Sequence, residues 1–134
     1  MSYIRWFSTL TVKDVPIVGG KNASLGEMLR TLQPEGICVP NGFATTADAY
    51  WKFINTNDLA KKIADELERW HMGGQSLQQA GATIRRLMRN GALPEELTEE
   101  LVKAYSSLSL EFKMDAVDVA VSSSATDEEL PKAS

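Results

Sequence analysis

Residues 18–32 read VGGKNASLGEMLRTL, and the rest of the sequence is best interpreted outward from them. After the glycine pair, apolar residues recur at the three- and four-residue spacing of a helix: Leu25, Met28, Leu29 and Leu32. Such a stripe buries one face of a helix, which we expect to begin at Asn22 and to end before Pro34. Two glycines and a lysine therefore stand at the entrance of an amphipathic helix.

The entrance of this predicted helix suits a bound anion. The first N–H groups of a helix have no partners within it, and the helix dipole adds partial positive charge there. Gly19 and Gly20 let a backbone approach a phosphate closely, and the Lys21 ammonium adds a full charge. Lys21 and the N–H groups of Gly20 and Asn22 are therefore candidate phosphate ligands. The spacing is not that of a Walker A loop, and a glycine pair before a helix is by itself more often a plain turn.

A second candidate lies towards the other end of the sequence. Valines alternate over residues 117–121 and predict a buried strand there. Three serines follow, and their small hydroxyl groups can donate hydrogen bonds to an oxyanion: Ser122, Ser123 and Ser124. Serines are also common turn formers, so composition alone leaves an ordinary loop open.

The remaining sequence predicts more helix than strand. Short strands are expected at residues 3–7 and 37–39, with a loop at 13–16 and a turn at 40–42. Helices are expected after a capping box at 45–48, from a cap at Asn57 or Asp58 to Trp70, from Ser76 with Gln79 to Gly91, and after Pro94. We therefore predict one helix-dominated α+β domain over residues 1–134.

Charge and composition exclude several classes of protein. The net charge of −4 argues against general binding to nucleic acid or to an anionic membrane. No run approaches the roughly 18 apolar residues of a membrane span, and the first residues do not resemble a secretory signal. Cys38 is the only cysteine, which excludes an internal disulfide, and its apolar neighbours predict that it is buried. A cytoplasmic location follows by default.

Catalytic and metal-binding groups are scarce. His71 is the only histidine, which excludes paired-histidine and Cys–His metal sites, and its place near a helix C-terminus favours a dipole contact. The acidic run at 127–129 could bind Mg²⁺, but such a run near a terminus is usually solvated. We therefore predict no catalytic residue and no metal ligand in this sequence.

Several long stretches together resemble the phosphoenolpyruvate synthase family, the pyruvate, water dikinases. They are residues 14–28, 39–50, 119–126 and 129–134, in the family's order and spacing. The resemblance implies the first part of an ATP-grasp-like nucleotide-binding domain, with Lys21 at the position of the family's phosphate-binding lysine. It also implies ATP with Mg²⁺ as the cofactor. The full-length enzymes convert ATP, pyruvate and water to phosphoenolpyruvate, AMP and phosphate.

The sequence departs from the family pattern in two respects. The family pattern Val-Arg-Ser-Ser-Ala-Thr has an arginine where this chain has Ser122. Loss of that charged donor is expected to weaken phosphate binding by about 1.5–3 kcal/mol. The family's acidic metal ligands, carrier histidine and pyruvate site also lie beyond residue 134. We therefore expect the isolated chain to transfer no phosphate.

Two other functions stay open at this point. A dikinase-like domain without its catalytic partners could serve as a binding or regulatory module, which would self-associate or bind the missing remainder of a dikinase through an exposed apolar face. Alternatively, an incomplete triphosphate clamp could hold an anion smaller than ATP.

Overall fold

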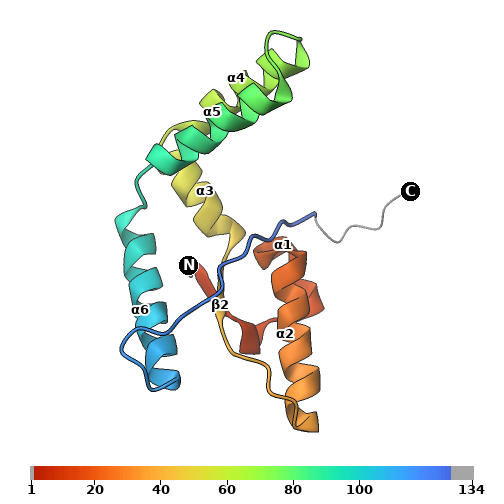
Figure 1. The fold of residues 1–134 in the computed structure, drawn as a ribbon, viewed down its shortest axis with the longest axis vertical. Helices are drawn as coiled ribbons and strands as arrows, with labels where there is room; N and C mark the ends of the chain where they lie inside the picture. The colour runs from red at the N-terminus through yellow and green to blue at the C-terminus, as the bar shows by residue number, and fades with distance from the viewer. Residues whose placement is uncertain (1, 128–134) are drawn as a thin grey trace, which may run out of the picture. The chain divides into compact units, whose positions relative to one another are not determined.

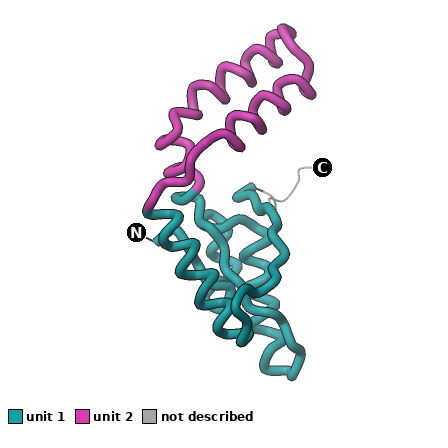
Figure 2. Tube along the Cα trace, turned by 60° about the vertical axis from the view of Figure 1, so that its left-hand side comes forward, with its two compact units in different colours: residues 1–49, 96–134 teal, residues 50–95 magenta. Residues whose placement is uncertain are grey.

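The computed structural model describes residues 2–127, which form two compact units. Unit 1 contains the described residues of 1–49 and 96–134, and unit 2 contains residues 50–95 (Figure 2). Both units are mainly helical, and a two-stranded antiparallel sheet lies in unit 1. The predicted helix-dominated α+β class is therefore confirmed, while a single domain over residues 1–134 stays a prediction.

The sheet of unit 1 pairs β1 (Ile4–Trp6) with β2 (Phe43–Thr45), so that Ile4 lies opposite Thr45. The Trp6 and Phe43 rings contact edge to face with their centroids 5.3 Å apart. The strand expected at 3–7 is thus confirmed in shorter form. The strand expected at 37–39 is wrong, because the backbone that pairs with β1 lies further along the chain. Cys38 consequently lies outside the sheet and is exposed, which contradicts its predicted burial.

Short helical turns connect β1 to the main helix of unit 1. The elements are two 3₁₀ helices, η1 (Phe7–Thr9) and η2 (Val12–Asp14), then α1 (Val15–Val18), α2 (Gly20–Leu32) and a last 3₁₀ helix, η3 (Gln33–Glu35). The loop expected at 13–16 is wrong, because Thr11 and Asp14 form a capping box there and Pro16 suits the first turn of α1. The predicted helix is confirmed, but it begins at Gly20 rather than Asn22. The predicted buried stripe is largely wrong: the buried residues are Gly20, Ala23, Gly26 and Leu29, whereas Met28 is exposed.

The core of unit 1 forms where α1 and α2 meet the segment after β1. Leu10 is completely buried there, and smaller apolar side chains surround it: Val18, Ala23 and Ala44. The Arg30 guanidinium also donates a 2.6 Å hydrogen bond to the Leu10 carbonyl oxygen, so the backbone at this point is held from α2. Burial of one stripe of α2 therefore fixes the start of that helix relative to the sheet.

Helix α6 (Glu95–Glu111) leads into an extended segment that ends unit 1. Leu97, Ala104 and Leu108 bury one face of this helix. The strand expected at 117–121 is wrong: Val117 is buried, but Val121 is 91% exposed, and the described residues form no ladder there. A strand needs a neighbour to pair its N–H and C=O groups, and residues 2–127 place none beside this segment.

Unit 2 is built around a hairpin of α4 (Leu59–His71) and α5 (Leu77–Asn90), which follow α3 (Ala47–Thr56) (Figure 1). The capping box of Ser76 and Gln79 is confirmed in both of its hydrogen bonds. The capping box predicted at 45–48 is wrong, and the cap predicted at Asn57 or Asp58 is confirmed in position only, because Asp58 is the N-cap residue of α4. Thr45 belongs to β2, so it is the Thr46 hydroxyl that accepts the Ala49 N–H. At the start of α4, neither Asn57 nor Asp58 supplies a side-chain cap: Asp58 makes no such bond and Asn57 contacts Phe53 and Ala92 instead.

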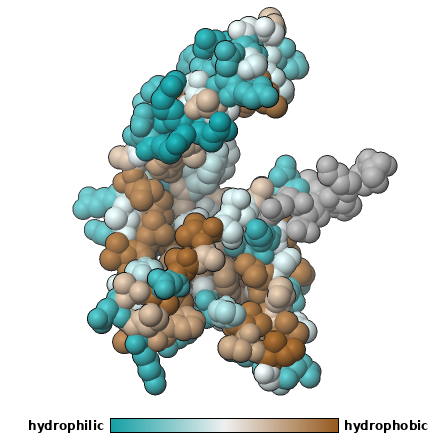
Figure 3. Space-filling view, viewed as in Figure 1, coloured by the Kyte–Doolittle hydropathy of each residue, from teal (hydrophilic) through white to brown (hydrophobic). Residues whose placement is uncertain are grey.

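The surface of the two units differs in character. On the face drawn in Figure 3, hydrophilic residues predominate over the α4–α5 hairpin, whereas apolar residues gather over unit 1. Exposed apolar side chains of unit 1 include Val102, Leu110 and Val121. None of the helices found in residues 2–127 combines the length and the apolar content needed to cross a membrane.

Candidate functional site

The predicted phosphate-binding turn is the junction between α1 and α2, where Gly19 ends one helix and begins the next. Its N–H donates a 2.8 Å hydrogen bond to the Val15 carbonyl, and its carbonyl accepts the Ala23 N–H at 3.1 Å. Gly19 has φ +87° and ψ 164°, a backbone conformation that other residues rarely adopt. A Cβ added to Gly19 would also collide with the Ser124 hydroxyl and lie 3.0 Å from the Ala125 backbone. Gly19 therefore permits both the sharp turn and a close approach by the serine segment.

Two backbone N–H groups of the first turn of α2 join this helix to the serine segment. The Gly20 N–H donates to the Ala125 carbonyl oxygen at 3.1 Å. The Asn22 N–H donates to Ser124 Oγ at 3.4 Å, a long hydrogen bond between residues 102 positions apart. The Asn22 side chain in turn donates to the Val18 carbonyl at 2.9 Å, which ties the ends of α1 and α2 together. Figure 1 shows the segment after α6 running past this helix entrance.

The two stretches that the sequence singled out are thus brought together in unit 1. The sequence did not show, however, that Ser124 accepts the Asn22 N–H and that Ala125 accepts the Gly20 N–H. One sequence signal bears on this contact. Gly19, at the N-cap position of α2, has no side chain that could accept a hydrogen bond, so these N–H groups need acceptors from water, a ligand or another segment. The N–H groups that were expected to face a ligand are occupied in this structure by the chain's own oxygens.

The other predicted ligands, Lys21, Ser122 and Ser123, are exposed to solvent. Lys21 is exposed as the second residue of α2, and the first turn of that helix carries no acidic residue. Ser122 and Ser123 are exposed, whereas Ser124 is half-buried against the turn. The chain therefore places an exposed lysine at the positive end of a 13-residue helix, and two exposed serines in the segment that reaches this end through Ser124 and Ala125.

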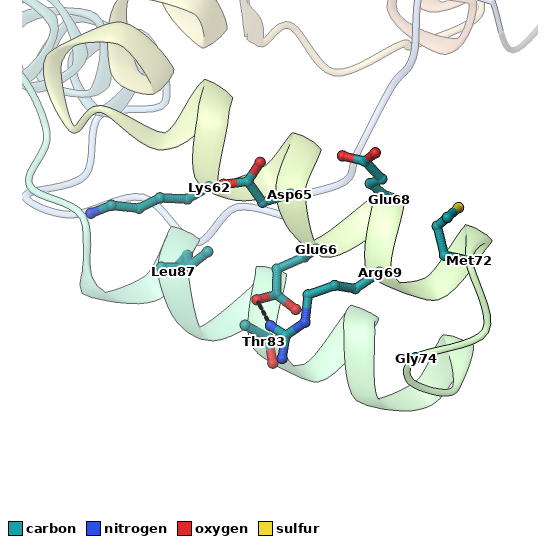
Figure 4. A pocket seen from close by; sticks show the side chains of 9 residues that line it. All are labelled: Lys62, Asp65, Glu66, Glu68, Arg69, Met72, Gly74, Thr83 and Leu87. Carbon is teal, nitrogen blue, oxygen red and sulfur yellow. Dashed lines mark hydrogen bonds and ion pairs between the residues drawn. The ribbon is translucent and has the colours of Figure 1, made fainter.

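A groove of about 710 Å³ on unit 2 offers a different kind of surface (Figure 4). Its charged lining residues are three acids and two bases: Asp65, Glu66, Glu68, Lys62 and Arg69. The Arg69 guanidinium binds Glu66 at 2.9 Å, and the Gln75 amide donates to the same carboxylate at 2.7 Å. The acidic excess and the engaged arginine make this groove a poor receptor for a phosphate, and no predicted ligand lines it.

Other candidates contribute no site to the described part of the chain. His71 is exposed in the last turn of α4, where its position matches the expected place near a helix C-terminus. Among residues 2–127, no three His, Cys, Asp or Glu side chains gather in a way that could hold a metal ion. The acidic run at 127–129 lies mostly outside the described residues, and the stretch at 129–134 lies wholly outside them.

Comparison with known proteins identifies the family to which the chain is similar. Residues 15–134 match the family model described as "Pyruvate phosphate dikinase, AMP/ATP-binding domain". The chain is 46% identical over 132 residues to phosphoenolpyruvate synthase of Aquifex aeolicus, covering 98% of this chain and 15% of that protein. It is 44% identical over 135 residues to the Helicobacter pylori enzyme, with 100% and 17% covered, and 40% identical over 132 residues to the Escherichia coli enzyme, with 98% and 16% covered.

The chain therefore spans about a sixth of the length of these curated relatives. The matched portion includes both the glycine–lysine turn and the serine segment, since the family model begins at residue 15 and continues to residue 134. The full-length identity and the family match lead to one conclusion: the chain belongs to the pyruvate phosphate dikinase AMP/ATP-binding domain family and corresponds to the N-terminal, ATP-binding portion of phosphoenolpyruvate synthase.

Proposed function

We propose that this chain binds the phosphates of Mg-ATP at the junction of α1, α2 and the serine segment. The whole protein to which such a portion belongs would convert ATP, pyruvate and water to phosphoenolpyruvate, AMP and phosphate. In this proposal, Lys21 supplies the charge, Ser122 and Ser123 supply hydroxyl donors, and the turn formed by Gly19, Gly20 and Asn22 supplies the positive end of α2.

The observation that carries this proposal is the meeting of two stretches that are distant in sequence. Hydrogen bonds from Gly20 and Asn22 hold Ala125 and Ser124 at the start of α2, beside the exposed Lys21. A helix entrance of this kind attracts anions, and the first turn of α2 itself contains no acidic residue. A phosphate that reached the two N–H groups directly would have to displace Ser124 and Ala125, so Lys21 and the exposed serines form the first contacts.

Two features limit the proposal to binding. Ser122 stands where the resemblance implies an arginine, which removes a forked cationic donor from the phosphates. Mg²⁺ enters only as the partner of ATP, because residues 2–127 assemble no group of three metal-ligand side chains. We propose binding without phosphoryl transfer for the chain alone, and a cytoplasmic location, which suits a free and exposed Cys38.

Isothermal titration calorimetry with Mg-ATP tests the role of Lys21. The comparison uses the wild type, Lys21→Ala and a matched control, Lys103→Ala, which removes the same charge from an exposed position on α6 of the same unit. Loss of a charge-assisted contact predicts about 10- to 100-fold weaker binding for Lys21→Ala and no change for the control. Equal affinities for all three proteins would remove Lys21 from the site.

Two further measurements test the two other functions that the sequence leaves open, binding of an anion smaller than ATP and service as an interaction module. If inorganic pyrophosphate binds through Lys21 while ATP does not, the ligand is an anion smaller than ATP. Size-exclusion chromatography with light scattering addresses the interaction module. An oligomer that is indifferent to ATP would contradict the proposal, and a monomer that binds ATP would support it.

A further inference from the structure

We propose that Ser124 is a positioning residue: its hydroxyl fastens the segment of residues 117–125, here called the strap, to the start of α2. Ser122 and Ser123 are then the hydroxyl groups presented to a ligand. This inference rests on the proposed ATP function for the identity of that ligand. The three serines are adjacent in the sequence and look equivalent there. In the structure, Ser124 holds the strap, whereas Ser122 and Ser123 face solvent.

The strap is fixed at its first residue by α6. The Tyr105 hydroxyl donates a 2.6 Å hydrogen bond to the Val117 carbonyl, and the Val117 N–H donates to Ser109 Oγ at 3.2 Å. Ser109 and Val117 are both buried, so water does not readily replace either bond. This end of the strap is consequently set by packing and by paired backbone groups.

The strap is fixed again at its last two residues by α2. The Ala125 carbonyl accepts the Gly20 N–H, and Ser124 Oγ accepts the Asn22 N–H. The space beside Gly19 is so tight that an added Cβ there would strike Ser124 Oγ, which shows that this hydroxyl faces the turn. The Ser124 hydroxyl oxygen therefore accepts a hydrogen bond from the start of α2 in the absence of any ligand.

Between these two attachments the backbone of the strap has no support of its own. Within residues 2–127, no hydrogen bond holds the backbone of residues 118–123. The placement of Ser122 and Ser123 thus depends on the attachments at either end. Release of one end would let both hydroxyl groups move relative to the start of α2, and their ordering on ligand binding would then cost conformational entropy.

The first measurement needs no ligand. Amide hydrogen exchange of Gly20 and Asn22 is followed by NMR in the full chain for the wild type, Ser124→Ala, Ser124→Thr and Ser123→Ala. Loss of one neutral hydrogen bond predicts about three- to tenfold faster exchange at Asn22 in Ser124→Ala. The Ser124→Thr protein, which keeps the hydroxyl, should retain the wild-type rate, and Ser123→Ala should leave Asn22 unchanged.

The second measurement is Mg-ATP affinity for the same proteins and for Tyr105→Phe, which removes one of the two hydrogen bonds that hold the other end of the strap. Ser124→Ala and Tyr105→Phe should each bind ATP about three- to tenfold more weakly, and Ser124→Thr should restore the affinity. Ser123→Ala should weaken binding without any change at Asn22 in the free protein, as a direct ligand would.

Two results would overturn the positioning role. If Ser124→Ala weakens ATP binding but leaves Asn22 exchange unchanged, Ser124 is a direct ligand. If Asn22 exchange accelerates while ATP affinity is unchanged, the strap does not position the ligand groups. Failure of the proposed function gives a different pattern: the wild type and Lys21→Ala would bind ATP equally or not at all. That pattern would remove the claim that the strap presents Ser122 and Ser123 to ATP. The exchange data would still decide whether Ser124 holds the strap.

Discussion

Replacement of Gly19 by alanine tests the closest contact in the candidate site. Gly19 has φ +87° and ψ 164°, a combination that L-residues adopt only under strain. The new Cβ would collide with Ser124 Oγ and lie 3.0 Å from both the backbone nitrogen and the carbonyl oxygen of Ala125. The strap cannot move away from the new Cβ without losing its hydrogen bonds to Gly20 and Asn22.

The magnitude follows from two separate effects. A non-glycine residue in this backbone region costs about 1–3 kcal/mol. Forcing an additional methyl group into a packed contact costs roughly another 1–3 kcal/mol, partly relieved if the strap detaches. We expect Gly19→Ala to lower the free energy of unfolding by about 2–6 kcal/mol, a large fraction of the 5–15 kcal/mol typical of a folded protein.

Gly36→Ala is the matched control. Gly36 lies in unit 1 and also has a positive φ, +82°, but a Cβ there would meet nothing within 4 Å. Its replacement carries backbone strain alone, about 1–2 kcal/mol. Urea denaturation followed by circular dichroism gives the free energy of unfolding of each variant, and Mg-ATP calorimetry shows whether binding is lost in Gly19→Ala and kept in Gly36→Ala.

The contact with Ser124 can be isolated by a double-mutant cycle. Ser124→Ala removes the oxygen that the new Cβ would strike, so the cost of Gly19→Ala should fall in that background. If Gly19→Ala destabilises no more than Gly36→Ala, and if its cost is the same with and without the Ser124 hydroxyl, the strap does not lie against the turn and the site as described does not exist.

Three more substitutions test the core, a helix cap and the serine segment. Leu10→Ala should lower the free energy of unfolding by about 2–5 kcal/mol in urea denaturation, because Leu10 is completely buried in the core of unit 1. Ser76→Ala should cost about 1 kcal/mol by the same measurement, since it removes the oxygen that accepts the Gln79 N–H at the start of α5. Ser122→Arg, which restores the residue implied by the family resemblance, should tighten Mg-ATP binding about 10- to 100-fold in calorimetry through a charge-assisted contact. An affinity unchanged by the arginine would place residue 122 away from the phosphates.

The helices were largely predictable because their signals are local. The stripe that begins at Leu25 marks α2, and Ser76 with Gln79 marks the start of α5, since each pattern acts within a few residues. Local sequence patterns did not predict all the strands correctly, because a strand forms only where another segment pairs with it. The apolar residues at 37–39 have the composition of a strand, but β1 pairs with Phe43–Thr45, which leaves Cys38 exposed.

In the candidate site, too, local features were predictable and a contact between distant residues was not. Residues 19–22 and 122–124 were recognisable from their chemistry, and the structure brings these two stretches together. The acceptor role of Ser124 was not recognisable, because it depends on a contact across 102 positions of the sequence. Likewise, the valine alternation at 117–121 predicts a strand, but no neighbour pairs with it in residues 2–127.

An NMR titration of the isotopically labelled chain with Mg-ATP tests the location of the site most directly. We expect the largest amide shifts in residues 19–22 and 122–125, with little change in the α4–α5 hairpin. Shifts that concentrate around Glu66 and Arg69 in the groove of unit 2, or that are as large in Lys21→Ala as in the wild type, would contradict this expectation.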